Sequence, residues 1–333
     1  MKIRNFGEFK FIDRIKRGCV VRPAGVIKAI DDDCCVFRTP DKMVNLLTTD
    51  LLIEDVHFLR EAISPFKLGR KSLAVNISDI AAMGGTPGEA VISIAIPETV
   101  EIEYLDEFYE GMRSMCREFE VNILGGDTTS SRKHLVINIA LTGWIAEEEV
   151  LYRSGARPGD VAFLTGAVGS SAAGLDLVLS GRDFEKAGEL LEAHYNPVPH
   201  VRQGRIIAGL KAATAMIDVS DGVASDLGHI CSDSSVAAVV ELDSVPVTDA
   251  FLRYCSKFNL DFEKLALHVG EDYVLLGTVP DRRAGELKAA LESGGCSFFP
   301  FGRIVEGRGL HLKMPDGSLR EIPSSGYDHF KDS

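Results

Sequence analysis

The chain has 333 residues and a mass of 36.1 kDa, and 45% of its residues are hydrophobic while 26% are charged. This length predicts two domains, and this composition excludes an intrinsically disordered chain. Asp and Glu number 49 against 36 Lys and Arg, a net charge of −13 that makes nucleic acid and anionic membranes unfavourable partners. Phosphorylated small molecules stay open as ligands, because divalent cations held by carboxylates reverse the local charge.

The first half of the chain predicts a sheet covered by helices. Apolar runs predict strands at 44–47, 90–96, 121–124 and 135–142. A helix is predicted over 65–83, because Ser64 and Pro65 form a start signal and two glycines follow Met83. A second helix is predicted near 105–119, where apolar residues recur every three or four positions, and we expect it to pack on the sheet.

Turn-forming residues at 153–160 place a domain boundary near 145–155, so we expect an N-terminal domain over 1–148 and a C-terminal domain over 149–333. The second half predicts alternating helices and strands, with a glycine-rich turn after its first strand. They are a strand at 161–165, helices near 170–180 and 201–211, a strand at 215–218, a helix near 222–231, a strand at 236–242, and alternating helices and strands to residue 330.

The N-terminus and the cysteines indicate the compartment. The first 17 residues are charged throughout, and no run approaches the roughly 18 apolar residues of a membrane span, so we expect a cytoplasmic protein. The seven cysteines are odd in number and include no C-x-x-C pair. They predict reduced, mostly buried thiols rather than a disulfide framework or a zinc site.

Aspartates recur where apolar runs end. Four such runs end in a small polar residue or glycine followed by aspartate, at Asp50, Asp79, Asp127 and the pair Asp218 and Asp221, and a triple aspartate occupies 31–33. Mg²⁺ prefers oxygen ligands, and the ends of secondary structure are rigid places from which to present them. A single aspartate is more often a turn residue or a helix cap, which Asp221 would also suit, so the prediction depends on the recurrence.

Four further features have both a functional and a structural interpretation. The glycine-rich segment 165–174 follows a strand and opens a helix, where backbone N–H groups bind anions, but it lacks a Walker A lysine and a G-x-G-x-x-G pattern. Close packing of helix on strand is the alternative. His57, Glu271 and Arg153 are candidate substrate contacts that could equally be structural or solvated.

Short motifs occur in a fixed order along nearly the whole chain: Gly7-Glu-Phe9, Asp32-Asp33, Thr48-Thr-Asp50, Val56-His-Phe58, Lys71-Ser-Leu-Ala-Val-Asn-Ile-Ser-Asp-Ile-Ala-Ala-Met-Gly84, Gly125-Gly-Asp-Thr-Thr129, Arg153-Ser-Gly-Ala-Arg-Pro-Gly-Asp160, Ile217-Asp-Val-Ser-Asp-Gly222, Gly270-Glu-Asp-Tyr273 and Gly326-Tyr-Asp-His-Phe330. In this order the motifs resemble those of the thiamine-monophosphate kinase family, within the AIR-synthase-like (PurM) superfamily. The lysine-to-glycine helix and the last motif favour this family over the superfamily in general.

The resemblance implies a two-domain α+β PurM-like fold. Its N-terminal domain, with a mixed sheet and helices, would bind ATP and Mg²⁺ and form a homodimer, and its C-terminal domain would be α/β. The implied activity is ATP-dependent phosphorylation of thiamine monophosphate to thiamine diphosphate, the last step of thiamine diphosphate biosynthesis. The transfer would be direct and in line, assisted by several Mg²⁺ ions.

The resemblance also implies roles for individual residues. Mg²⁺ ligands would be Asp33, Thr48, Thr49, Asp50, Asp79, Asp127, Asp218 and Asp221, of which Asp79, Asp127 and Asp218 would be catalytic. ATP would contact Tyr109, Gly126, Asp127, Arg153 and Ser220. Thiamine monophosphate would contact His57, Glu271 and Tyr327.

The chain departs from the family pattern at Asp31 and Asp55, where glycine is usual, and at His200, where arginine is common. Two alternatives stay open. One is another superfamily enzyme, such as a selenophosphate synthetase or a hydrogenase-maturation protein, which would need a reactive cysteine, for which Cys19 is the only early candidate. The other is a non-catalytic protein that binds nucleotide and metal.

Overall fold

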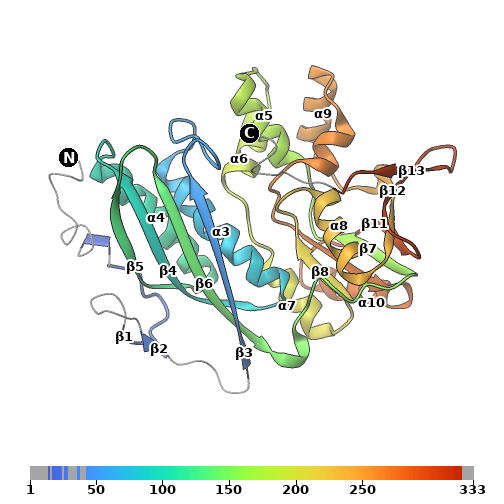
Figure 1. Cartoon of the computed structure of the whole chain (residues 1–333), viewed down its shortest axis with the longest axis horizontal. Coiled ribbons are helices and arrows are strands. Elements are labelled where there is room, and N and C mark those ends of the chain that lie inside the picture. The colour runs from blue at the N-terminus through green and yellow to red at the C-terminus, as the bar shows by residue number, and fades with distance from the viewer. Residues whose placement is uncertain (1–13, 16, 25, 29–35, 38–42, 325–333) are drawn as a thin grey trace. The chain divides into compact units, whose positions relative to one another are not determined.

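The structure is a computed structural model that describes residues 14–15, 17–24, 26–28, 36–37 and 43–324 (Figure 1). The chain divides into two compact units. The first comprises Met1–Ile80 and Thr86–Glu147, and the second comprises Ala81–Gly85 and Glu148–Ser333. Helices and mixed sheets occur in both units, which confirms the predicted two-domain α+β fold class.

The first unit is built on a four-stranded sheet in which the four predicted strands all occur and are longer than predicted. Their order is β3 (Met43–Ile53), β6 (Val136–Ala146), β4 (Thr86–Pro97) and β5 (Asn122–Ser131). β4 and β5 are parallel and the other two pairs are antiparallel, so the sheet is mixed. β1 (Val26–Lys28) and β2 (Val36–Phe37) form a separate antiparallel pair.

Helices α3 (Pro65–Ala82) and α4 (Ile102–Phe119) lie on one face of this sheet (Figure 1). On the face that they cover, Ile137, Ile139 and Leu141 of β6 are fully buried. On the opposite face, Leu47 and Leu51 of β3 are 75% and 48% exposed. Successive strand residues point to opposite faces, so the sheet has one apolar core face and one open face.

The two helices cross in backbone contact, because each has a glycine at the crossing. A Cβ added at Gly69 would lie 1.9 Å from the Phe108 carbonyl oxygen, and one added at Gly111 would lie 2.0 Å from the Phe66 carbonyl oxygen. Real Cβ atoms do not approach a backbone oxygen this closely. Both positions therefore exclude every residue except glycine.

The second unit is built on a seven-stranded sheet in which one neighbouring pair, β12 with β9, is parallel and the others are antiparallel. Its order is β13 (Leu319–Ile322), β12 (Gly309–Lys313), β9 (Ala237–Val240), β11 (Phe299–Val305), β7 (Asp160–Leu164), β10 (Leu275–Pro280) and β8 (Ala215–Asp218).

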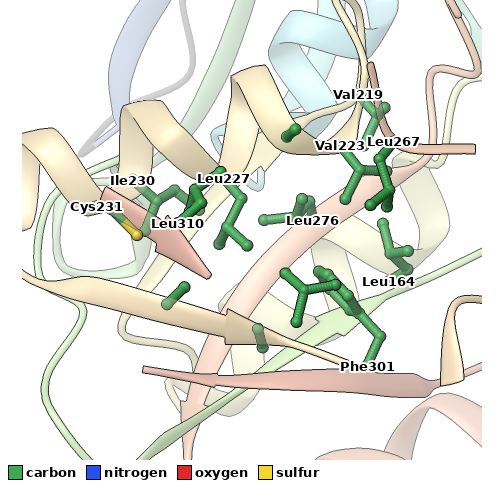
Figure 2. Packing of buried hydrophobic residues seen from close by; sticks show 14 of the residues in the cluster. Leu164, Val219, Val223, Leu227, Ile230, Cys231, Leu267, Leu276, Phe301 and Leu310 are labelled. Carbon is green, nitrogen blue, oxygen red and sulfur yellow. The ribbon is translucent and has the colours of Figure 1, made fainter. Parts of the chain in front are cut away.

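Helix α8 (Val223–Ser234) packs on this sheet through one large apolar cluster (Figure 2). Figure 2 shows Leu227, Ile230 and Cys231 of α8 facing Leu276 and Leu310 of the strands. A second cluster, centred on Phe251 and Tyr254, joins α5 (Ser170–Ser180), α6 (Ala187–Tyr195) and α9 (Asp249–Phe258). The remaining helices are α7 (Val201–Leu210) and α10 (Asp281–Ser293), with short helical turns at Glu147–Glu149, Leu242–Ser244 and Lys264–His268.

The predicted helices at 170–180 and 201–211 and the strand at 215–218 are confirmed within one residue. Helix α6 was not predicted, because its nine residues offer too short an apolar pattern. Within the described part of the chain, no helix is both long and apolar enough to span a membrane.

The helix crossing gives a first prediction. We expect Gly111→Ala to lower the free energy of unfolding by about 2–3 kcal/mol, because the added methyl group forces two backbones apart. Gly285→Ala is the control, since it lies in helix α10 with nothing within 4 Å of an added Cβ. We expect this control to be neutral or to stabilise by up to about 1 kcal/mol. Urea unfolding followed by circular dichroism checks both, and an equal effect at the two sites would contradict the packing argument.

Candidate active site

In the first unit, a strand and a helix bring predicted metal ligands together. Thr48 of β3 donates a hydrogen bond through its hydroxyl to Asp79 Oδ2 of α3. Thr48 and Asp50 pair in register with Leu141 and Ile139, both buried under the helices, so they lie on the covered face as Asp79 does. The site therefore offers one hydroxyl and two carboxylates at a junction of strand and helix.

Thr49 lies on the other face of the sheet. Its hydroxyl oxygen accepts a hydrogen bond from Asn138 Nδ2 at 2.9 Å, and its register partner is Ala140, whose neighbours Ile139 and Leu141 face the helices. Side chains alternate along a strand, so Thr49 cannot present its hydroxyl beside that of Thr48. The side chain of Thr49 is therefore not available to an ion held by Thr48 and Asp79.

Gly126 and Asp127 lie on the edge strand β5, where both are exposed. A Cβ at Gly126 would lie 1.8 Å from the Ile92 carbonyl oxygen of β4, so the close approach of the two strands requires glycine. Asp127 pairs with Ser93 one position further along the ladder. The second glycine of the Gly-Gly-Asp motif thus has a structural reason that is independent of any ligand.

In the second unit, three carboxylates gather where β8 ends and α8 begins. Asp218 is 4% exposed at the end of β8, and Asp221 is exposed in the turn that follows. Asp226, in the first turn of α8, is 1% exposed. Burial, followed by the negative charges of Asp218 and Asp221, raises the pKa of Asp226 to about 8.

Asp221 does not cap α8, contrary to the capping interpretation of this residue. The N-cap is Gly222, whose φ of 101° is in a region that favours glycine, and no side chain bonds to the helix start from that position. The carboxylate of Asp226 instead bonds back to the turn, through Oδ2, to the backbone N–H groups of Ser220 and Asp221. Sequence reasoning missed Asp226, although an aspartate next to the apolar residues of a helix's first turn is a usable signal.

The loop that carries Glu271 is fixed by its neighbour Asp272. Asp272 is half-buried and accepts hydrogen bonds from the backbone N–H groups of Gly169 at 2.8 Å and Ser171 at 3.1 Å. Burial raises the pKa of Asp272 to about 6, against the lowering effect of these two bonds. Gly270 and Tyr273 on either side have positive φ angles of 122° and 53°.

These contacts decide between the two interpretations of the glycine-rich segment. The N–H groups at the start of α5 bind an anion, as such helix ends do, but the anion is the side chain of Asp272. Gly169 also packs closely, since an added Cβ would lie 2.8 Å from the Phe251 ring. The segment is therefore a structural junction rather than a free phosphate cradle.

The other predicted site residues are dispersed. His57 lies in a turn after β3, where its Nδ1 accepts a hydrogen bond from the backbone N–H of Ile53 at 3.0 Å. Asp55, in the same turn, has a φ of 66°, which explains the glycine that is usual there. Tyr109 is 2% exposed inside α4 and packs edge-on against Phe108, so any ATP contact would require local opening. Arg153 is exposed in the second unit, whereas Asp33 and Tyr327 lie outside the described residues.

The donor chemistry fits magnesium. The gathered ligands are carboxylate and hydroxyl oxygens, which suit a hard cation and not zinc. The charges of Asp218 and Asp221 oppose the ionisation of Asp226, and a divalent cation would relieve this repulsion. Across the residues that the structure describes, no three Asp, Glu, His or Cys side chains are placed so that they could hold a metal ion together. A smaller set of protein ligands is typical of Mg²⁺, which is usually bound by one or two carboxylates together with substrate phosphates.

Comparison with known proteins places this arrangement in a class. The sequence matches the family described as AIR synthase related protein, with the N-terminal domain over residues 31–145 and the C-terminal domain over residues 157–314. The chain therefore belongs to the AIR synthase related family. Hydrogenase maturation protein HypE in complex with ATP has a TM-score of 0.80 over 99% of both chains. At 18% identity, this similarity supports the fold alone.

Closer relatives narrow the class. Thiamine-monophosphate kinase of Salmonella typhimurium is 36% identical over 330 residues, 97% of this chain and 98% of the relative. The crystal structure of thiamine-monophosphate kinase from Stenotrophomonas maltophilia has a TM-score of 0.82 at 30% identity, over 94% of this chain and 98% of that one. AaThiL complexed with AMPPCP and TMP has a TM-score of 0.78 at 32% identity over 99% of both chains. The chain belongs to the thiamine-monophosphate kinase family.

His200, where the family commonly has arginine, lies beside the junction of β7 and α5. Its Nδ1 is 2.6 Å from the hydroxyl of Thr165, and burial lowers its pKa from 6.5 to about 4. The folded chain therefore keeps His200 neutral at pH 5, where the unfolded chain protonates it.

Because the folded pKa is the lower one, His200 should cost stability as the pH falls from about 6.5 to 4. We expect the parent to lose about 2 kcal/mol through this group between pH 7 and pH 5. His200→Asn, which keeps a partner for Thr165, should remove that part of the loss. Urea unfolding at both pH values checks this, with the exposed His229→Asn as control. An unchanged pH dependence in His200→Asn would contradict the prediction.

Proposed function

We propose that this chain transfers the γ-phosphoryl group of ATP to thiamine monophosphate, forming ADP and thiamine diphosphate as the last step of thiamine diphosphate biosynthesis. The observation that carries the proposal is the near full-length match to thiamine-monophosphate kinases, in which the motifs for both substrates are present. AMPPCP is an unreactive analogue of ATP, so the AaThiL complex supports the same pair of substrates.

The reaction needs alignment and charge neutralisation more than acid–base chemistry. The acceptor phosphate is already anionic at neutral pH, so its oxygen can attack the γ-phosphorus without a strong base. The bond from the γ-phosphorus to the bridging oxygen then breaks, and its electron pair leaves with ADP. Bound Mg²⁺ supplies neutralisation of the phosphate charges.

The chain's own residues would position these groups. We assign Asp33, Thr48, Asp50, Asp79, Asp127, Asp218 and Asp221 to Mg²⁺ through side chains, and Thr49 through its carbonyl. Tyr109, Gly126, Arg153 and Ser220 would contact ATP, and His57, Glu271 and Tyr327 would contact thiamine monophosphate. Asp272 would hold the Glu271 loop against α5, because its carboxylate already bonds to two amides there.

Cys19 argues against a superfamily enzyme that depends on a reactive thiol. Its thiol is buried and donates a hydrogen bond to the Ile15 carbonyl oxygen at 3.0 Å. Burial raises its pKa to about 11, so the reactive thiolate is suppressed at neutral pH. The described cysteines are free thiols, which suits the cytoplasm, where we propose that the enzyme works.

A coupled assay for ADP with ATP, Mg²⁺ and thiamine monophosphate tests the function. We expect ADP release that depends on the acceptor, whereas a non-catalytic binding protein would release none. Asp79→Asn and Asp218→Asn should each lower kcat by roughly 100-fold, since each removes a negative charge from a proposed metal site.

The matched control is Asp233→Asn, which changes an exposed aspartate of α8. We expect its kcat to stay within about twofold of the parent. Full turnover in Asp79→Asn or Asp218→Asn at saturating Mg²⁺ would show that the metal assignment is wrong.

We also propose that the chain is a homodimer joined through the open face of the four-stranded sheet. Met43, Leu47, Leu51 and Val91 are exposed, and the register of β3, β6 and β4 places them on that one face. Several large apolar residues exposed on one sheet face mark an interaction surface. A second copy fits because the same face on both partners gives a self-complementary interface.

Leu47→Glu should therefore shift the chain from dimer to monomer, because it places a charge in the proposed interface. Sedimentation velocity at micromolar concentration measures the change. Leu179→Glu is the control, since Leu179 is also highly exposed but lies on α5 of the second unit. Equal sedimentation of the parent and Leu47→Glu would refute this interface.

A further inference from the structure

Asp226 lies behind the turn that carries Asp218 and Asp221. It extends from the first turn of α8, and its Oδ2 accepts the backbone N–H groups of Ser220 at 3.1 Å and Asp221 at 3.3 Å. With 1% of its surface exposed, it is turned away from solvent. Its bonds therefore act on the backbone of the turn and not on a ligand.

The same turn is held at two other points. The Val219 N–H donates to the Val274 carbonyl oxygen, and the Tyr273 N–H donates to the Val219 carbonyl oxygen, each at 2.8 Å. A Cβ at Gly222 would lie 3.0 Å from the backbone of residues 267–269. These contacts fix the turn at Val219 and Gly222, and the stretch between them, Ser220 and Asp221, is fixed by Asp226.

We propose that Asp226 is a positioning residue of the phosphoryl-transfer site, whose carboxylate orients the Asp218–Asp221 turn so that both aspartates can bind one divalent cation. This inference rests on the proposed function. Bonds from two amides to one carboxylate oxygen set the direction of the backbone on which Asp221 is carried. A third carboxylate at this place costs free energy, because it is buried and because Asp218 and Asp221 repel its charge. Both effects raise the pKa of Asp226.

A substitution that keeps a hydrogen-bond acceptor but removes the charge distinguishes this positioning role from direct binding of the cation. Asp226→Asn keeps an oxygen for the two amides, whereas Asp226→Ala leaves both amides without it. If the role is positioning, asparagine rescues the site. If Asp226 supplied its charge to the cation, asparagine and alanine would be equally poor.

The test titrates each variant with Mn²⁺ alone, with free Mn²⁺ measured by electron paramagnetic resonance. We expect Asp226→Asn to bind within about threefold of the parent, and Asp226→Ala to bind at least about tenfold more weakly. Steady-state assays should give the same order for the Mg²⁺ concentration at half-maximal rate. Asp226→Ser replaces the alanine variant if the latter does not fold, with the same weakening expected, because its hydroxyl is too short to reach both amides.

Asp160 provides a matched control at the other end of the sheet. It is also a buried carboxylate, and its Oδ2 accepts from the Arg157 N–H at 2.9 Å and the Thr214 hydroxyl at 2.6 Å. Asp160→Ala should lower thermal stability as Asp226→Ala does, yet leave Mn²⁺ binding unchanged.

Equal Mn²⁺ binding in Asp226→Ala and Asp160→Ala, or no rescue by asparagine, would overturn the inference. The proposed function fails separately, through the absence of acceptor-dependent ADP release in the parent. The Mn²⁺ titration does not depend on that result.

Discussion

A carboxylate removed from water loses several kcal/mol of solvation unless hydrogen-bond donors replace it. Asp226 and Asp272 both meet this condition by accepting two backbone N–H groups each. Through these bonds, each ties a loop of the second unit to a helix start. Asp221, which is exposed, and Glu271, which is half-buried, lie on those loops, so the bonds of a neighbouring carboxylate support each of them.

In the first unit, strand geometry rather than a buried carboxylate positions the acidic residues. Alternation along β3 places Thr48 and Asp50 on the face covered by α3, where Thr48 bonds to Asp79. The intervening Thr49 bonds to Asn138 on the open face. A rigid ladder therefore divides a short motif into side chains that face α3 and a residue of the opposite surface.

Much of this could be predicted from the sequence, because apolar periodicity sets the strands and helices and because aspartates at strand ends signal an oxygen-ligand site. What the sequence could not distinguish is which of two adjacent acids bonds to the start of a helix. Glu271 and Asp272 are adjacent and both are half-buried, yet Asp272 is the one that accepts the N–H groups at the start of α5. The loop also has positive φ angles at Gly270 and Tyr273, which apolar periodicity does not predict. The contact of Gly69 and Gly111 is equally non-local, since it joins two helices.

The two ends of β10 differ in what they carry. Leu275 at one end pairs with Asp218, whereas Pro280 at the other pairs with Asp160. At the Pro280 end, the Asp160 carboxylate bonds to the turn before β7. This turn contains Gly159, where an added Cβ meets nothing within 4 Å. An affinity tag or an immobilisation handle inserted at this turn would lie a full strand length from the Asp218 turn, which makes it the natural attachment point for engineering the enzyme.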